Sequence, residues 1–191
     1  LAMSSLITPK IILYSVFEMV CELSMVYDSC MIVKFTDLAA IRARHSDKKI
    51  VLTTGTFDLF HIGHVRYLQS VKSYGDIVVV MLSGDARVKA RKGSERPVYP
   101  ERDRAEILDE LKATDYVFID PGDNKRGHID PVYADILASL QPDLYVTDGE
   151  DDRFSKNLIG RTKLVILPRA EGGKHASTTA IIEHIAGIIK D

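Results

Sequence analysis

The segment that decides the fold of this chain is Ile50-Val51-Leu52-Thr53-Thr54-Gly55-Thr56-Phe57-Asp58-Leu59-Phe60-His61-Ile62-Gly63-His64. It opens with an apolar, β-branched run of strand length, and residues 65–72 behind it carry apolar side chains at helical spacing. Gly55 therefore lies where a strand turns into a helix. Such a junction points free backbone N–H groups at anions, and a glycine there lets the backbone approach a ligand closely. His61 and His64 share one side of the first helical turn, so two imidazole donors beside exposed amides predict a phosphate site.

Taken singly, each of these residues is also typical of an ordinary role. A histidine near a helix start often caps the helix or packs against it, and a glycine often only makes a turn. The whole constellation, directly behind a strand of the buried type, favours the phosphate site.

The composition of the chain is that of a single-domain globular enzyme. Its 191 residues are 46% hydrophobic and 27% charged, with a formal net charge of −2. This charge argues against general binding to nucleic acid or to a membrane surface, so an anion site depends on local positive charge. Such charge gathers in one short segment, opposed only by Glu95: Arg87, Lys89, Arg91, Lys92 and Arg96.

The first thirty residues differ from the rest of the chain. Cys21 and Cys30 are the only cysteines, so the remaining chain has no thiol chemistry, and a cytoplasmic location is expected. Residues 11–33 are apolar, but acidic residues interrupt them before any run reaches the roughly 18 residues of a membrane-spanning helix. A signal peptide fits poorly for the same reason, and no membrane association is expected.

Residues 1–30 are therefore interpreted as an N-terminal extension, and residues 31–191 as the enzyme domain. Two hypotheses for the extension stay open. In one, Met31 begins the essential enzyme. In the other, residues 11–27 form an amphipathic helix that packs on the domain or on a second subunit.

Within the domain, apolar runs of strand length alternate with helical patterns. This alternation predicts an α/β fold, a single doubly wound parallel sheet of about five strands. The expected strands are 50–54, 77–82, 115–119, 143–147 and 163–167, and the expected helices are a short capped one from residue 36 and longer ones near 63–74, 100–112, 131–140 and 177–189. Right-handed crossovers give these five strands the order 3-2-1-4-5, which opens a ligand crevice at their carboxyl ends.

Two motifs, Thr54-Gly55-Thr56-Phe57-Asp58 and His61-Ile62-Gly63-His64, closely resemble the signature of the cytidylyltransferase-like nucleotidyltransferases. Three further segments match in the right order: Val88-Lys89-Ala90-Arg91-Lys92-Gly93, Pro100-Glu101-Arg102-Asp103-Arg104-Ala105-Glu106-Ile107-Leu108 and Ala176-Ser177-Thr178-Thr179. The resemblance spans about residues 32–187 and implies a Rossmann-like nucleotidyltransferase fold. It also implies transfer of CMP or AMP from CTP or ATP to a small phosphorylated acceptor, a sugar or alcohol phosphate, with release of pyrophosphate.

The resemblance further implies a homodimer, and Mg²⁺ that arrives with the nucleoside triphosphate and is held largely by its oxygens. No metal site made by the protein alone is expected. The remaining histidines are scattered without ligand spacing: His45, His128, His175 and His184.

Site residues follow from the same resemblance. Catalytic contacts are expected from His61 and His64, from Lys89 on a loop after the second strand, and from Arg104. Nucleotide contacts are expected from Thr54, Gly55, Thr56, Phe57, Lys92, Arg169, Ser177 and Thr178. Arg91 is a candidate to share the task of Lys89, and Arg102 ranks below Arg104 as surface charge or a helper.

Several of these residues have a second interpretation. Ser177 and Thr178 are typical of a helix N-cap, a role that overlaps with phosphate binding. Asp58 either is structural or helps to position a metal or a histidine, and the structural role is favoured. The link from Gly172 to Ser177 is longer than in close relatives, which makes Lys174 and His175 candidates for an added phosphate or acceptor contact.

Three functions are compared for the His-Ile-Gly-His string. Nucleotidyl transfer accounts for all the charged motifs together. Aminoacyl-adenylate formation, as in class I aminoacyl-tRNA synthetases, fits badly because the chain lacks a Lys-Met-Ser-Lys-Ser segment and a broad basic face. The alternative is a nucleotide-binding regulatory module without turnover. Only an assay of pyrophosphate release distinguishes such a module from the enzyme. The choice between CTP and ATP and the identity of the acceptor stay open.

Overall fold

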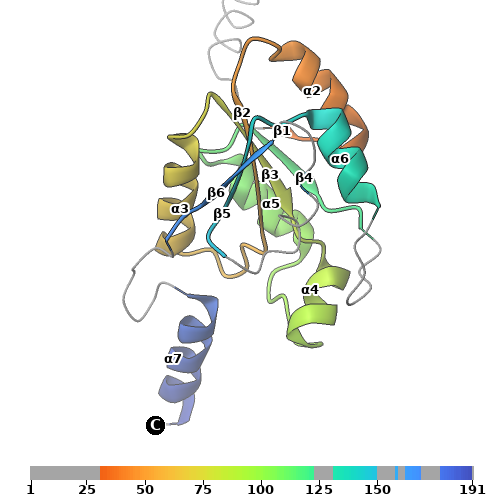
Figure 1. Cartoon of the computed structure of the whole chain (residues 1–191). Helices are drawn as coiled ribbons and strands as arrows, with labels where there is room; N and C mark the ends of the chain where they lie inside the picture. Colours follow the sequence, from red (N-terminus) through yellow and green to blue (C-terminus); the bar gives the residue numbers. More distant parts are fainter. Residues whose placement is uncertain (1–30, 123–130, 150–157, 159–161, 169–176, 191) are drawn as a thin grey trace, which may run out of the picture.

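The computed structural model describes residues 31–122, 131–149, 158, 162–168 and 177–190. Both hypotheses for residues 1–30 lie outside the described residues. The described residues form one parallel sheet of six strands in the order β1-β4-β3-β2-β5-β6 (Figure 1). The strands are β1 Met31–Ile32, β2 Ile50–Gly55, β3 Ile77–Leu82, β4 Tyr116–Ile119, β5 Leu144–Thr147 and β6 Lys163–Ile166. The helices are η1 Phe35–Asp37, α2 Leu38–Arg44, α3 Ile62–Lys72, α4 Asp85–Lys92, α5 Glu101–Asp109, α6 Val132–Leu140 and α7 Thr178–Lys190.

The doubly wound parallel sheet predicted from the sequence is confirmed. Strands β2 to β6 correspond to the five predicted strands and follow each other in the predicted spatial order. The prediction of about five strands missed β1, which adds a sixth at the edge beside β4. Its register is set by backbone bonds, from Met31 N to Asp115 O (3.1 Å) and from Val33 N to Val117 O (2.8 Å). A strand of two residues carries no periodicity that a sequence pattern can reveal.

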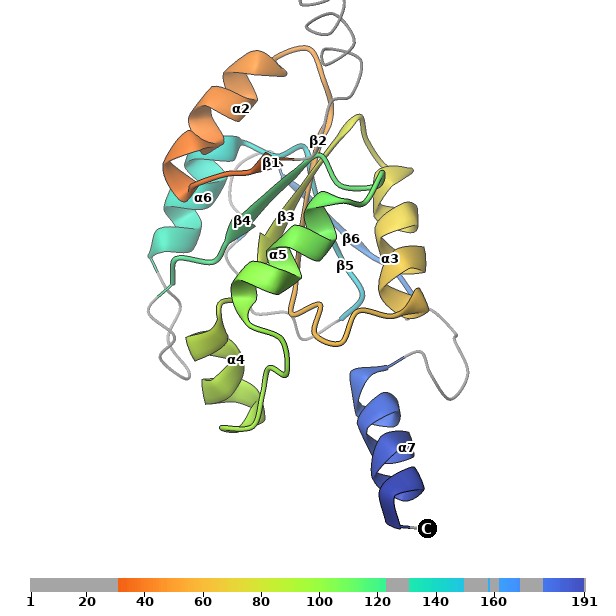
Figure 2. The same ribbon diagram turned by 180° about the vertical axis from the view of Figure 1, so that it is seen from behind.

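Helices cover both faces of the sheet (Figures 1 and 2), and each face carries its own apolar core. Successive side chains of a strand point to opposite faces, so Ile50 and Leu52 of β2 pack with α2 and α6, whereas Val51 packs with α3 and α5. All three side chains are fully buried. Because helices cover both faces, the central strands read as continuous apolar runs rather than as alternating ones.

The basic segment after β3 is a helix, α4, and the prediction of a loop there was wrong. Its first amide, Asp85 N, donates to Oε2 of Glu101 over 2.7 Å, a cap supplied by another helix. Asp85 lies in the first turn and three basic residues in the last, which complements the helix dipole. Gly93, with φ of 102°, ends the helix. Val88 is the only buried residue of α4, so a pattern of apolar side chains did not reveal it.

Helix α7 stands beyond the carboxyl ends of the strands, apart from the two helical layers (Figure 2). Its isoleucines at 185, 188 and 189 are 48%, 63% and 78% exposed. No helix in the described ranges is long and apolar enough to cross a membrane.

Candidate functional site

The turn that follows β2 is built on two residues in the left-handed region. Phe57 and Leu59 have φ of 47° and 45°, a conformation that few non-glycine residues adopt and that often marks a functional site. A Cβ added to Gly55 would lie 2.5 Å from Cε2 of Phe57, whose side chain is 4% exposed. Gly55 therefore makes room for the Phe57 ring, a reason that the sequence did not indicate. The nucleotide contacts expected from the backbone of this turn stay predictions.

The two histidines of the second motif lie face to face at the start of α3. Their rings are stacked, with centroids 3.8 Å apart and planes inclined by 21°. His61 is the N-cap of α3, and its Nδ1 accepts from Gly63 N over 3.1 Å. Nδ1 of His64 accepts from His61 N over a longer 3.4 Å. A neutral imidazole that accepts at Nδ1 carries its proton on Nε2, so each ring keeps an Nε2–H donor.

Both imidazoles are held in the neutral form. Burial lowers the pKa of His61. Burial, together with the adjacent His61 ring and the Lys92 charge, lowers the pKa of His64 to about 3, against a smaller opposing effect of Asp58. The ring of His64 contacts Phe57 edge-on and Phe60 at a tilt, with a centroid distance of 5.3 Å to each. At neutral pH the pair therefore offers hydrogen-bond donors without charge.

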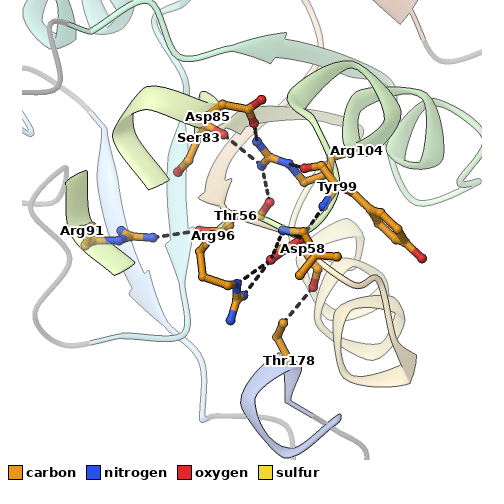
Figure 3. Close-up of polar contacts among 10 residues, drawn as sticks. Thr56, Asp58, Ser83, Asp85, Arg91, Arg96, Tyr99, Arg104 and Thr178 are labelled. Atoms are coloured by element: carbon orange, nitrogen blue, oxygen red, sulfur yellow. Dashed lines mark hydrogen bonds and ion pairs between the residues drawn. The ribbon is translucent and has the colours of Figure 1, made fainter. Parts of the chain in front are cut away.

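Asp58 ties the turn to the segment between α4 and α5 (Figure 3). Its carboxylate, which is fully buried, accepts from Arg96 Nε (2.8 Å), from Val98 N (3.0 Å) and from Tyr99 N (3.1 Å). Burial alone would raise the pKa of Asp58, but the Tyr99 and Val98 amides and the Arg96 guanidinium outweigh burial and lower it. The structural role favoured from the sequence is thus the one that the contacts support.

Arg104 lies behind the turn and not at its surface. Its side chain is fully buried, and it donates to the carbonyls of Tyr99 (2.9 Å), Thr56 (2.6 Å) and Ser83 (2.9 Å) and to Oδ1 of Asp85 (2.7 Å). Figure 3 shows these bonds radiating from one guanidinium to three segments. In this geometry the guanidinium holds carbonyls that shape the turn, and the catalytic contact expected from the resemblance stays a prediction. Arg102, two positions earlier, is exposed.

Two basic residues of α4 reach the same turn. Arg91 Nη2 donates to Oγ1 of Thr56 over 2.8 Å. The positive charge of Lys92 lies close enough to His64 to lower the pKa of that ring. Partial desolvation, then the charges of Arg91 and Arg96, lower the pKa of Lys92 itself. Lys89, the residue favoured for a catalytic contact, has an exposed side chain on α4.

Helix α7 begins against the same turn. Thr178 donates its hydroxyl to the backbone carbonyl of Asp58 over 2.8 Å, and Ser177 Oγ accepts from Ala180 N over 3.2 Å. Ser177 thus has the N-cap geometry that was one of its two interpretations. Arg169, Lys174 and His175 lie outside the described residues.

The structure offers no protein-made metal site in the part of the chain that it describes, where no group of three His, Cys, Asp or Glu side chains is suitably placed. His45 pairs with Tyr116 through Nε2, 2.8 Å from the hydroxyl, and His184 is exposed on α7. His128 lies outside the described residues.

The sequence did not single out two polar residues that shape the site. Arg96 counted only as one of several clustered charges, although it is the partner of Asp58. Tyr145 of β5 places its hydroxyl 2.7 Å from Oγ1 of Thr54, a residue expected to face the nucleotide. A tyrosine within an apolar run looks like a core residue, so no pattern in the sequence marked it.

Three pieces that are distant in the sequence therefore meet at the turn after β2. They are the stacked histidines, the basic end of α4 and the hydroxyl-bearing start of α7. The turn lies at the carboxyl end of β2, beside the point where the strand order reverses between β2 and β5. Ligands of doubly wound sheets bind at such a point. Neutral N–H donors, cations and a helix N-terminus together form a site suited to a polyphosphate.

Comparison with known proteins places the chain among relatives. The model of the cytidylyltransferase-like family matches residues 52–184. The bifunctional protein HldE of Helicobacter pylori (strain G27) is 40% identical over 147 residues, which cover 77% of this chain and 30% of that protein. The HldE protein of a Nitratiruptor species is 40% identical over 140 residues, covering 72% and 28%. The chain thus spans about three tenths of the length of these curated relatives.

Solved structures share the fold at much lower identity. Pantoate-beta-alanine ligase from Francisella tularensis superposes with a TM-score of 0.53 and 16% identity, over 84% of this chain and 80% of that chain. This likeness concerns the fold alone. The family predicted from the two motifs is confirmed by the match over residues 52–184 and by the relatives at 40% identity. The chain belongs to the cytidylyltransferase-like family.

Proposed function

We propose that this chain is a nucleotidyltransferase that moves CMP or AMP from CTP or ATP to a small phosphorylated acceptor, a sugar or alcohol phosphate, and releases pyrophosphate. The observation that carries this proposal is the meeting of the histidine pair, α4 and α7 at one turn, in a member of this family. We place the reaction in the cytoplasm, where nucleoside triphosphates are available.

The chemistry needs alignment and charge neutralisation rather than a general base. The second pKa of a phosphomonoester is about 6, so the acceptor phosphate is largely a dianion at neutral pH. One of its oxygens attacks the α-phosphorus of the triphosphate in line with the leaving group. The new P–O bond forms as the bond between the α-phosphorus and its bridge oxygen breaks, and the electron pair leaves with pyrophosphate.

The histidine pair is assigned to the transferring phosphate. Each neutral ring donates from Nε2 to an oxygen on the α-phosphate or on its bridge, where negative charge grows in the transition state. The stacking of His61 on His64 and the contacts of His64 with Phe57 and Phe60 support this role, because they orient the rings before the substrate binds. Loss of one donor of this kind typically costs about 10²–10³ in turnover.

The other two pieces are assigned to the triphosphate tail and the nucleotide. Lys89, Lys92 and Arg91 supply cations from α4, and the N-terminus of α7 at Ser177 and Thr178 faces the β- and γ-phosphates. Arg169 stays a proposed nucleotide contact by family resemblance. Arg104 is proposed as a positioning residue, since its donors already hold the carbonyls that shape the turn.

Mg²⁺ fits this site as a companion of the triphosphate. Asp58 is the carboxylate of the motif, but Arg96 and two backbone amides occupy it, so it is not available as a ligand. The ion would be held by phosphate oxygens and water, and it would neutralise phosphate charge. The protein's own part is to orient the nucleotide and the acceptor.

The test is a thermal-shift screen of nucleoside triphosphates, followed by pyrophosphate release with a panel of sugar and alcohol phosphates. The proposal expects stabilisation by CTP or ATP and release only in the presence of a phosphorylated acceptor. Stabilisation without release, across the whole panel, would favour the regulatory module. Lack of binding to either triphosphate would rule out both functions.

A homodimer is part of the proposal. Apolar side chains support it, because Leu164 and Ile166 of β6 are 42% and 47% exposed and three isoleucines of α7 are more so. Light scattering on the full chain measures the mass directly. A monomer at micromolar concentration would contradict the proposed homodimer and would leave the proposed nucleotidyl transfer unaffected.

A further inference from the structure

Arg87, on the first turns of α4, makes a set of contacts separate from those at the turn after β2. Its Nε lies 2.6 Å from Oδ2 of Asp120, the residue that follows β4. Its guanidinium also lies over the ring of Tyr133 in α6, 5.1 Å from the ring centroid. The side chain of Arg87 is 22% exposed, whereas that of Asp120 is 3% exposed. In this ion pair the carboxylate of Asp120 is buried, and the arginine side chain is partly accessible to solvent.

Asp120 is held firmly enough to orient the arginine. Its Oδ1 accepts from Gly122 N over 2.9 Å, and its Oδ2 accepts from the Tyr133 hydroxyl over 3.2 Å. Asp120 binds Arg87 at Nε, and Tyr133 supports one face of the guanidinium. Among the described residues, no acceptor contacts the two Nη groups. A guanidinium fixed in this way presents a planar fork of donors, which matches two oxygens of a phosphate.

The position of Arg87 separates it from the triphosphate site. Arg87 and Arg91 are four residues apart, so they share one face of α4 with Cβ atoms about 5–6 Å apart. Arg91 contacts Thr56 beyond the end of β2, and Arg87 contacts Asp120 beyond the end of β4. With β3 between them, these two strand ends are about 10 Å apart. Arg87 therefore lies near the carboxyl end of β4, whereas α7 meets the turn after β2.

We propose that Arg87, oriented by Asp120 and Tyr133, binds the phosphate group of the acceptor, a phosphomonoester. This inference rests on the proposed nucleotidyl transfer. The fork holds two phosphate oxygens and leaves the third free to attack the α-phosphorus held at the turn after β2. Arg87 would touch the substrate, and Asp120 and Tyr133 are positioning residues.

The test measures binding of inorganic phosphate to the full chain by isothermal titration, with the nucleotide site filled by a non-hydrolysable triphosphate analogue. Arg87→Ala should weaken phosphate binding about 10- to 100-fold, the range for a hydrogen-bonded charge pair. Affinity for the analogue should stay within about twofold, because distant sites without shared partners couple weakly. Arg87→Lys keeps the charge and the pairing with Asp120 but loses the fork, so it should recover only part of the affinity. Tyr133→Phe should weaken phosphate binding less than Arg87→Ala, and Lys112→Ala, which removes an exposed charge that makes none of these contacts, should have no effect.

Unchanged phosphate affinity in Arg87→Ala and Arg87→Lys would show a purely structural ion pair and overturn the inference. So would a lack of phosphate binding by the unmodified chain, or a loss of analogue affinity with phosphate binding intact. In each case nucleotide binding by the unmodified chain and pyrophosphate release report separately on the proposed function. Circular dichroism shows whether each variant keeps its fold. If Arg87→Ala does not fold, the phosphate affinity of Arg87→Lys decides the test.

Discussion

The hydroxyl of Thr178 donates to the backbone carbonyl of Asp58 over 2.8 Å, across 120 positions of sequence. The carboxylate of the same Asp58 holds Arg96 and the amides of Val98 and Tyr99. One residue thus connects the turn after β2 with α7 and with the segment ahead of α5. Changes at either partner are expected to reach the proposed nucleotide site.

Thr178→Val removes the hydroxyl donor and keeps the shape of the side chain. The start of α7 then loses its hydrogen bond to the turn, a contribution of about 0.5–1.5 kcal/mol. We expect the KM for the nucleoside triphosphate to rise about 2- to 10-fold, which is that energy expressed as a binding ratio. Steady-state pyrophosphate release measures it. Thr179→Val, at the exposed neighbouring position, is the control, and equal KM values for the two variants would show that the bond does not matter for the nucleotide.

Asp58→Asn removes a buried charge and leaves Arg96 without its partner. Breaking one side of a buried pair costs about 3–5 kcal/mol, and we expect urea unfolding to show a loss toward the lower end of that range. Because the folded-state pKa of Asp58 is lowered, its contribution is present at neutral pH and disappears as the pH falls below about 3.9. Asp103→Asn, on the exposed side of α5, is the matched control. If Asp58→Asn and Asp103→Asn unfold at the same urea concentration, the buried Asp58 pair does not contribute the expected stability.

The neutral state of His64 predicts a pH dependence of stability. Its folded-state pKa is about 3, so the unfolded chain takes up a proton below about pH 6.5 that the folded chain does not. Stability should therefore fall as the pH is lowered from about 6.5 toward about 3, and His64→Asn should make this slope shallower. Urea unfolding at a series of pH values measures the slope. Equal slopes for His64→Asn and the unmodified chain would contradict the lowered pKa of His64.

Arg104→Lys tests the difference between positioning and direct contact. Lysine keeps the charge but cannot reach the carbonyls of Thr56, Ser83 and Tyr99 together. We expect a loss of about 2–3 kcal/mol in unfolding free energy, because buried carbonyls lose their donors, and a fall in turnover that accompanies it. Arg102→Lys is the exposed control on the same helix. A large fall in turnover with full stability would instead support a direct catalytic contact.

The architecture was readable from the sequence where apolar runs were long. The buried strands β2 to β5 and the reversal of strand order followed from such runs, and the histidine pair at the start of α3 followed from a local motif. Helix α4 was missed because seven of its eight residues are not buried and its cap comes from Glu101, which lies in another helix. The pairing of Asp58 with Arg96 depends on a chain path that no local pattern encodes.

Arg104 illustrates the same limit on function. An arginine near a helix start in a phosphate-binding family is expected to touch the ligand. Arg104 is instead fully buried, because the carbonyls of Ser83, Thr56 and Tyr99, which come from distant parts of the chain, surround its guanidinium. The sequence therefore did not indicate what the Arg104 side chain contacts, and its expected role at the ligand stays a prediction.

The neutral imidazoles are proposed to stabilise charge on the transferring phosphate. The decisive measurement is pyrophosphate release by His64→Ala, with CTP or ATP and the best acceptor of the panel. We expect kcat to fall by about 10²–10³ in a protein that still folds and still binds the triphosphate. A kcat close to that of the unmodified chain would remove the histidine pair from the mechanism.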